Sequence, residues 1–324
     1  MDVLVTGHRG YIGVHLVDVL QRAGHRVTGC DSGLFDGCEW EAFAAPDVEL
    51  RKDVRELERE DVAGHDCVMH LAAISNDPMG DVDPELTLSV NRDASTRLAE
   101  LAKAAGVPRF LFAGSCSVYG QATDHDVVES DALSPLTAYA RSKIEVEEAV
   151  RPLADETFTP VFLRNATAYG HSPMLRIDLV VNNLLACALA LGEIRIMSDG
   201  TPWRPLIHCR DIARAFLALA KADVPPGVAV NVGANDENYQ VRDVAALVQE
   251  LVPQAQIEFT GEVGDDPRSY RVNFDLLGEL APRFRLEYTL RRGMKELHAK
   301  LVEHEFSRAD WEGNQFVRLR KLLA

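Results

Sequence analysis

The sequence predicts an α/β fold in which helices cover both faces of a doubly wound parallel sheet. Two observations support this prediction. Through the first half of the 324 residues, short apolar runs alternate with amphipathic helical patterns. In addition, the first apolar run, Asp2–Thr6, leads through a glycine-rich turn directly into a helical run that ends at Arg22. This strand, turn and helix are the opening unit of a parallel sheet.

The remaining elements follow from the same alternation. We expect strands at 2–6, 26–30, 48–51, 67–71, 109–113 and 160–164, and helices at 11–23, 54–62, 84–105 and 136–151. Asn91 lies in the middle of the fourth helix, where its side chain should bond backbone or water. After Tyr169-Gly170 the pattern changes. There we expect helices at 178–191, 210–221 and 241–251, strands at 194–197 and 228–233, a turn at Thr-Pro-Trp203-Arg204-Pro, and a peripheral helix in the tail 298–324.

The change of pattern predicts two domains, 1–170 and 171–324, which are partly interleaved. Lys and Arg number 34 against 50 Asp and Glu, a net charge of −16, which argues against nucleic acid or an anionic membrane as a partner. The chain starts on a strand without a signal-peptide pattern, and no apolar run is long enough to span a bilayer. Six scattered cysteines without a CxxC pair predict reduced, mostly buried thiols, no metal site and a cytoplasmic enzyme.

The glycine-rich turn is typical of dinucleotide binding. In Gly7-His-Arg-Gly10-Tyr-Ile-Gly13, three glycines allow a sharp turn, close approach of a pyrophosphate, and packing of the helix on the strand. Asp31 ends the next strand, where a carboxylate accepts hydrogen bonds from a ribose 2′-OH and repels a 2′-phosphate. No arginine follows at 32–34, which favours NAD over NADP. The alternative is that Asp31 is only a turn residue.

A second pattern predicts acid–base chemistry. Tyr139 and Lys143 are four residues apart on an expected helix, so they share one face. The ammonium stabilises a phenolate and lowers the pKa of the tyrosine, which makes it a general acid and base. Ser115 ends a strand and can hydrogen-bond the same substrate oxygen.

Together these motifs resemble the extended short-chain dehydrogenase/reductase superfamily, in its NAD-dependent nucleotide-sugar epimerase/dehydratase branch. The resemblance covers nearly the whole chain. Its markers are the glycine motif, Asp31, Asp53-Val54, His70-Leu-Ala-Ala73, Ser115 to Gly120, Tyr139-x-x-x-Lys143, Leu163 to Gly170 and His208-Cys-Arg-Asp211. It implies a Rossmann domain that holds NAD, a smaller mixed α/β C-terminal lobe that holds a nucleotide diphosphate sugar, and a homodimer.

The resemblance also implies roles for single residues. Catalysis falls to Ser115, Tyr139 and Lys143. Cofactor binding falls to Gly7, Gly10, Tyr11, Ile12, Gly13, Asp31, Asp53, Val54, Leu71, Ala72, Ala73, Tyr139 and Lys143. Substrate binding falls to Ser115, Ser117, Asn183, Arg204 and Arg268. Arginines suit a diphosphate because the guanidinium binds it through two hydrogen bonds. The alternative for Arg204 and for Arg268 is a surface salt bridge.

Two departures from the family pattern bear on the reaction. Dehydratases of this branch place Asp-Glu where this chain has Cys116 and Ser117, and many epimerases read Arg-x-x-Asn where Arg164 is followed by Thr167. We interpret Cys116 mainly as a small packing residue rather than a catalytic thiol. The resulting hypothesis is an epimerase that acts at C4 of a nucleotide sugar through a 4-keto intermediate. The alternatives are a 4-ketoreductase, dehydrogenase or dehydratase on a related sugar, and a non-catalytic NAD sensor.

Overall fold

The computed structural model describes residues 1–75, 77–80, 82–259 and 268–324, and its centre is one parallel sheet of seven strands. The strand order is β11-β7-β5-β4-β1-β2-β3, and every neighbouring pair is parallel. The bounds are β1 Asp2–Thr6, β2 Arg26–Cys30, β3 Val48–Leu50, β4 Cys67–His70, β5 Arg109–Ser115, β7 Thr159–Asn165 and β11 Val228–Val232. The predicted doubly wound fold is confirmed.

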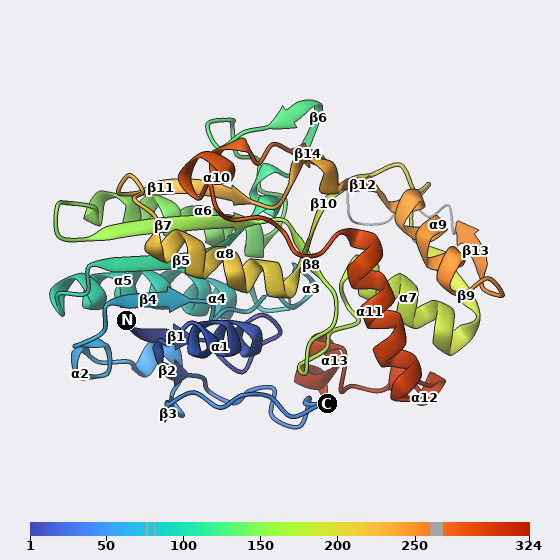
Figure 1. Cartoon of the computed structure of the whole chain (residues 1–324), viewed down its shortest axis with the longest axis horizontal. Coiled ribbons are helices and arrows are strands. Elements are labelled where there is room, and N and C mark those ends of the chain that lie inside the picture. Colours follow the sequence, from blue (N-terminus) through green and yellow to red (C-terminus); the bar gives the residue numbers. More distant parts are fainter. Residues whose placement is uncertain (76, 81, 260–267) are drawn as a thin grey trace.

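Helices cover both faces of this sheet (Figure 1). On one face, α1 (Gly13–Arg22) and α8 (Cys209–Lys221) bury Leu16, Leu20 and Phe216 in a common core with β1, β5 and β7. On the other face, α5 (Ala94–Ala104) and α6 (Ala138–Val150) bury Leu98 and Val146. Because the strands are parallel, their carboxyl ends meet along one edge, where an α/β sheet binds its ligands.

A second group of elements packs beside that edge, with its own core (Figure 1). It contains the sheet β12-β10-β8, the parallel pair β13-β9 and three helices, whereas the parallel pair β14-β6 buries Val127, Tyr270 and Val272 in the core of the large sheet. The bounds are β6 Gln121–Val127, β8 Thr167–Tyr169, α7 Val180–Leu191, β9 Glu193–Ile196, β10 Trp203–His208, β12 Asn238–Gln240, α9 Val241–Leu251, β13 Gln256–Phe259, β14 Ser269–Val272 and α11 Leu290–Glu303. Two elements from the second half of the chain, β11 and α8, belong to the large sheet and its cover.

The expected helix at 84–105 is interrupted by a π turn. It consists of α4 Pro84–Leu88, the turn η2 Ser89–Asp93 and α5. Asn91 lies in the turn, accepts a hydrogen bond from the Ile74 N–H at 2.8 Å and donates to the Ile74 carbonyl at 3.0 Å. The expectation that Asn91 bonds backbone is therefore confirmed.

Three local predictions are wrong. The expected turn around Trp203 is the start of β10. Trp203 and Pro205 pair with β12, a strand more distant in the sequence than a local turn pattern can reveal. The expected helix 54–62 consists of the 3-10 turn η1 Val54–Glu56 and α2 Arg59–Val62, since Asp53 and Glu58 each cap a new start.

The tail is also different from the prediction. Residues 298–324 do not form one peripheral helix, because they begin inside α11 and bury Leu301, Phe306 and Phe316 in the second core. The short helices α12 Arg308–Glu312 and α13 Arg318–Leu323 complete the tail, while α3 Asp77–Gly80 and α10 Asp275–Leu280 complete the described helices. Within the described residues, no helix combines the length and apolarity that crossing a membrane requires.

Candidate functional site

The glycine turn between β1 and α1 leaves no room for side chains at two of its positions. Gly7 has φ +73°, and a Cβ there would lie 2.7 Å from the Ala72 nitrogen. A Cβ on Gly13 would lie 2.1 Å from the Gly7 carbonyl oxygen. The Gly10 N–H closes the turn onto the same carbonyl at 3.0 Å. The turn therefore brings bare backbone to the N-terminus of α1, the arrangement that a pyrophosphate requires.

Asp31 stands just beyond the carboxyl end of β2, beside this turn. Its carboxylate accepts hydrogen bonds from the backbone N–H groups of Arg9 at 3.1 Å and Gly33 at 2.9 Å. The Arg9 guanidinium is turned toward other carboxylates, among them Glu39 at 2.8 Å and Asp36 at 3.1 Å. The carboxylate of Asp31 is thus fixed in place, and the nearest arginine of the turn is neutralised by acidic partners.

The other residues predicted to meet the cofactor flank the same edge. The Leu71 N–H donates to the Thr6 carbonyl at 3.1 Å and the Ala72 N–H to the Thr6 hydroxyl at 3.3 Å, so the segment 71–73 lies against the end of β1. Val54 is buried. The Asp53 carboxylate is paired with Arg55 at 2.8 Å, and the Arg55 hydrogen bond holds the pKa of Asp53 below its usual value.

The predicted catalytic residues lie on β5 and α6, which are joined by Lys143. Its ammonium donates to the Ala113 carbonyl at 2.8 Å, two residues before Ser115 at the end of β5. The same nitrogen lies 5.4 Å from the ring centre of Tyr139 and 4.6 Å from that of Phe112. Burial lowers the pKa of Lys143 to about 7. The structure therefore places the ammonium beside the phenol, as the helical spacing predicts.

The residues after β5 form a 3-10 turn, η3 (Cys116–Tyr119), capped by Ser115. The Ser115 hydroxyl oxygen accepts from the Ser117 N–H at 3.1 Å, so its hydrogen remains available to a substrate oxygen. The Ser117 hydroxyl is buried and has no hydrogen-bond partner among the described residues. Cys116 is buried, donates to the Arg164 carbonyl at 3.1 Å, and has a pKa that burial raises far above its usual value. The thiol therefore packs, as expected.

Arg164, the arginine that is followed by Thr167 in place of the asparagine of many epimerases, is a buried structural residue. Its guanidinium binds the Glu147 carboxylate of α6 at 2.7 and 2.9 Å and donates to the Tyr119 hydroxyl at 3.0 Å. Side chains of Arg164 and Glu147 are 4% and 3% exposed. This ion pair ties α6 to β7 one turn beyond Lys143.

Arg176 is a site residue that the sequence reasoning missed. Its guanidinium binds Asp178 at 2.9 and 3.1 Å and donates to the Ser75 hydroxyl at 2.8 Å, beside the 71–73 segment. Burial alone would lower the pKa of Arg176, but Asp178, with smaller contributions from Tyr11 and Tyr139, raises it. The structure therefore buries a cation beside Ser75 and the 71–73 segment. The pair Arg176-x-Asp178 shortly after Tyr169-Gly170 was the available sequence signal.

The predicted substrate residues of the second lobe fall into two places. Asn183 opens α7 and donates to the Ile177 carbonyl at 3.0 Å, so it lies next to Arg176. Arg204 donates to the Trp203 carbonyl at 2.9 Å and to the Arg268 carbonyl, which brings these two arginines together at the start of β10.

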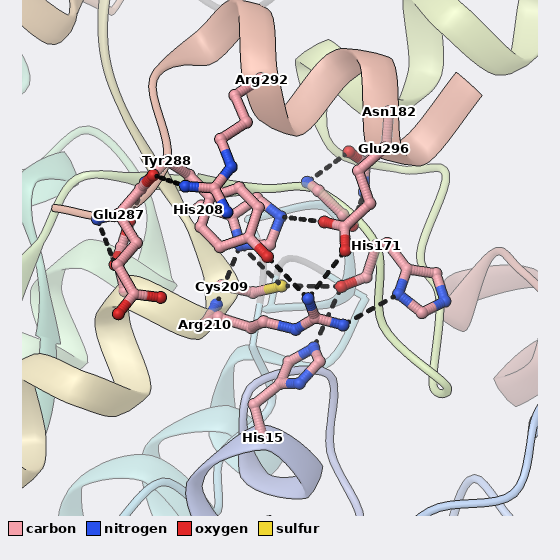
Figure 2. A network of polar contacts seen from close by, with 12 residues as sticks. His15, His171, Asn182, His208, Cys209, Arg210, Glu287, Tyr288, Arg292 and Glu296 are labelled. Atoms are coloured by element: carbon pink, nitrogen blue, oxygen red, sulfur yellow. Dashed lines mark hydrogen bonds and ion pairs between the residues drawn. The ribbon is translucent and has the colours of Figure 1, made fainter. Parts of the chain in front are cut away.

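The marker His208-Cys-Arg-Asp211 forms a buried polar joint rather than a catalytic centre (Figure 2). The His208 ring stacks on Tyr288 with 3.8 Å between ring centres, and its Nδ1 accepts from the Arg210 N–H at the start of α8. Arg210 binds Glu296 of α11 at 2.7 Å. The joint thus fastens α11 to the end of β10 and to the start of α8. Among the described residues, no group of His, Cys, Asp and Glu forms a metal site, and all six cysteines are buried and free.

Comparison with known proteins places this geometry in context. The model of the "NAD dependent epimerase/dehydratase family" matches residues 3–233. UDP-glucuronic acid decarboxylase 2 of Arabidopsis thaliana is 28% identical over 292 residues, which cover 86% of this chain and 64% of that protein. UDP-glucuronic acid decarboxylase 1 of Danio rerio is 27% identical over 83% of this chain and 65% of its own length. This chain thus spans slightly less than two thirds of these relatives.

Solved structures are similar over nearly the whole chain. TunA, an NAD-dependent NDP-hexosamine 5,6-dehydratase of tunicamycin biosynthesis, is 27% identical with a TM-score of 0.84, and the match covers 93% of this chain and 98% of TunA. MoeE5 in complex with UDP-glucuronic acid and NAD is 27% identical with a TM-score of 0.80, over 94% of this chain and all of MoeE5. UDP-glucose 4-epimerase of Thermotoga maritima, 21% identical over 94% of this chain and all of that chain, shares the fold with a TM-score of 0.82.

Proposed function

The chain belongs to the NAD-dependent epimerase/dehydratase family, and on that premise we propose that it binds NAD and a nucleotide diphosphate sugar, which it epimerises at C4. The observation that carries the proposal is the placement of the buried Lys143 ammonium between the β5 strand that ends in Ser115 and the phenol of Tyr139. Hydroxyl, phenol and ammonium at the carboxyl edge of a parallel sheet are the groups that reversible oxidation of a sugar alcohol needs.

The residues of this chain fit NAD. The bare backbone at Gly7 and Gly13 suits the pyrophosphate, and the fixed carboxylate of Asp31 suits the ribose hydroxyls. Because Asp31 repels a 2′-phosphate and Arg9 is neutralised by Asp36 and Glu39, we propose NAD rather than NADP. When bound, NAD supplies reversible two-electron oxidation at the sugar carbon.

The protein groups carry the proton. Tyr139 takes the proton from the 4-hydroxyl as the carbon is oxidised, and returns it when the 4-keto sugar is reduced on its other face. The Lys143 ammonium stabilises the phenolate in between. The Ser115 hydroxyl, whose oxygen already accepts from the Ser117 N–H, donates to the sugar oxygen. Ser117 supplies a second, unpartnered hydroxyl, and Arg176 a buried cation, to the sugar.

The second lobe would hold the rest of the substrate. Asn183, on α7 beside Arg176, is proposed to contact the diphosphate, and Arg204 with Arg268 the nucleoside or a phosphate oxygen. Guanidinium groups suit these anionic oxygens in an otherwise acidic chain. We also expect a homodimer, as in the family that the sequence resembles, which sedimentation velocity of the purified protein measures.

The residues after Ser115 favour epimerisation over elimination. Elimination of water needs an acid for the leaving hydroxyl and a base for the neighbouring carbon, and this chain offers Cys116 and Ser117 where related dehydratases carry carboxylates. Cys116 is a poor substitute, since its thiol is buried against the Arg164 carbonyl. Dehydration is nevertheless the second candidate, because the chain is similar to the dehydratase TunA over nearly its whole length.

The test is redox balance on a panel of nucleotide hexoses, hexosamines and hexuronates. Epimerisation yields two C4 epimers of equal mass, consumes no added cofactor and accumulates no NADH. In deuterium oxide the product stays unlabelled on carbon, because the C4 hydrogen never exchanges with solvent. Loss of water or of carbon dioxide marks a dehydratase or decarboxylase, stoichiometric NADH a dehydrogenase, and a need for added NADH a ketoreductase; each refutes epimerisation. Binding without turnover by any sugar marks a sensor.

The catalytic assignment has its own test. Tyr139→Phe should keep the fold and NAD binding yet lose turnover by roughly 10²–10⁴-fold, the usual contribution of general acid–base catalysis. Arg176→Ala should lower turnover or substrate affinity, although Arg176 is outside the predicted set. Near-normal turnover by Tyr139→Phe would mean that the proton is carried elsewhere.

A further inference from the structure

We infer that the hydroxyl of Tyr11 is a positioning group that couples the dinucleotide loop to the segment carrying Arg176, so that NAD and nucleoside diphosphate bind cooperatively. The inference rests on the proposed function, since it assigns NAD to the glycine turn and the nucleotide sugar to the second lobe. It adds a physical connection between the two sites.

Tyr11 lies inside the glycine turn, yet its side chain points away from the turn and into the second lobe. The hydroxyl donates to the Gly170 carbonyl at 2.6 Å and accepts from the Asn182 amide at 3.1 Å. The main-chain carbonyl of Tyr11 accepts from the Ser172 hydroxyl at 2.9 Å. The residue between Gly10 and Gly13 is therefore attached twice to the segment that follows β8.

Asn182 holds the other side of this connection, from the first turn of α7 (Figure 2). Its carboxamide oxygen accepts from the Gly170 N–H at 2.9 Å. Its amide group donates to the Arg176 carbonyl at 2.8 Å as well as to Tyr11. Asn182 thus hydrogen-bonds both ends of the segment 170–176, and the hydroxyl of Tyr11 connects Asn182 to the glycine turn.

Burial makes the connection stiff. The exposed fractions are 6% for Tyr11 and 0% for Asn182, so water does not replace a lost partner. Deleting the Tyr11 hydroxyl leaves the Asn182 amide and the Gly170 carbonyl each one partner short, and burial makes that loss expensive. Any shift of the turn that accommodates a pyrophosphate is consequently transmitted to Gly170 and, through Asn182, to the backbone of Arg176.

Cooperativity between two sites is reciprocal and typically amounts to about 5–150-fold in affinity. The experiment first selects, from UDP, dTDP, CDP and GDP, the nucleoside diphosphate that raises the melting temperature of the NAD-saturated protein most. Calorimetric titration then measures its Kd on nucleotide-free and on NAD-saturated protein. The wild-type ratio of the two Kd values should be at least about fivefold. In Tyr11→Phe it should fall to roughly a third of the wild-type value or less.

Tyr169→Phe is the matched control, because Tyr169 is also a buried tyrosine of the second core but its hydroxyl has no hydrogen-bond partner among the described residues. This variant should keep the wild-type ratio. A wild-type ratio near one, or an unchanged ratio in Tyr11→Phe even if that variant is less stable, overturns the coupling while leaving the proposed function intact. An equal loss in both variants also overturns it. If no nucleoside diphosphate binds, the proposed function and the coupling fall together.

Discussion

Replacing Lys143 by methionine should abolish turnover and yet stabilise the protein. Lys143 is 3% exposed, and burial lowers the pKa of its ammonium from the usual 10.5 to about 7. Each pKa unit corresponds to about 1.4 kcal/mol, so holding the charged form in the folded protein at neutral pH costs on the order of 5 kcal/mol. Methionine keeps most of the length of the lysine side chain, without its charge. We expect Lys143→Met to raise the free energy of unfolding by about 2–4 kcal/mol near pH 7, the remainder being lost with the hydrogen bond to Ala113.

The pH dependence gives this prediction its sign. Between about pH 7 and the unfolded lysine pKa of about 10.4, the unfolded wild-type chain holds one more proton at this site than the folded chain, so wild-type stability rises with pH. The advantage of Lys143→Met should therefore be largest at or below pH 7 and shrink by pH 9–10.

Urea unfolding of nucleotide-free protein at pH 6, 7, 8 and 9 measures this difference in stability. Lys295→Met, on the exposed side of α11, is the control and should change stability by less than about 0.5 kcal/mol. A destabilised Lys143→Met, or a gain equal at pH 6 and pH 9, refutes the reasoning.

Three further changes test other parts of the site. Asp31→Ala should weaken NAD binding by about 1–3 kcal/mol, measured by calorimetry, and wild-type protein that binds NADP as tightly as NAD would contradict the role of this carboxylate. Cys116→Ser should keep most of the turnover, measured with the preferred substrate, whereas a loss of 100-fold or more would make the thiol catalytic. Glu147→Gln should destabilise the protein by about 3–5 kcal/mol in urea unfolding, because it leaves the buried Arg164 without its counter-charge, and a loss below 1 kcal/mol would contradict the importance of the pair.

The sequence predicted the large sheet and the nucleotide side of the site because the signals there are local. An apolar strand, a glycine turn and an amphipathic helix follow one another within two dozen residues, so Gly7, Gly13 and Asp31 are placed by short-range geometry alone. The same holds for Tyr139 and Lys143, whose proximity needs only one turn of helix. Parallel order then brings these local units to one edge.

What the sequence did not reveal depends on partners far away in the chain. Arg176 reaches the predicted cofactor edge because its guanidinium donates to Ser75, about 100 residues earlier. Trp203 begins a strand because residues 238–240 pair with it. The hydrogen bonds of Asn182 are hidden for the same reason, since its carboxamide contacts Gly170 and also Tyr11, which is 171 residues earlier than Asn182. Neither the residue types nor their spacing distinguishes such contacts from ordinary polar surface.

Two charged groups one turn apart on α6, Lys143 and Glu147, explain how the predicted site remains in place although burying Lys143 destabilises the fold. Lys143 is buried, donates to the Ala113 carbonyl and lies beside the rings of Phe112 and Tyr139, and burying its charge penalises folding. One turn later, Glu147 forms a fully buried ion pair with Arg164 of β7. A further turn on, Arg151 binds Glu147 at 3.3 Å and the Gly227 carbonyl. These paired charges thus fix α6 to the sheet in the two turns that follow Lys143. In its proposed catalytic role the Lys143 ammonium needs a low pKa and a precise position, and different turns of α6 meet these two needs. Burial of Lys143 removes its hydration and so lowers its pKa. The next turn of α6 attaches the helix to β7 through the ion pair of Glu147 with Arg164.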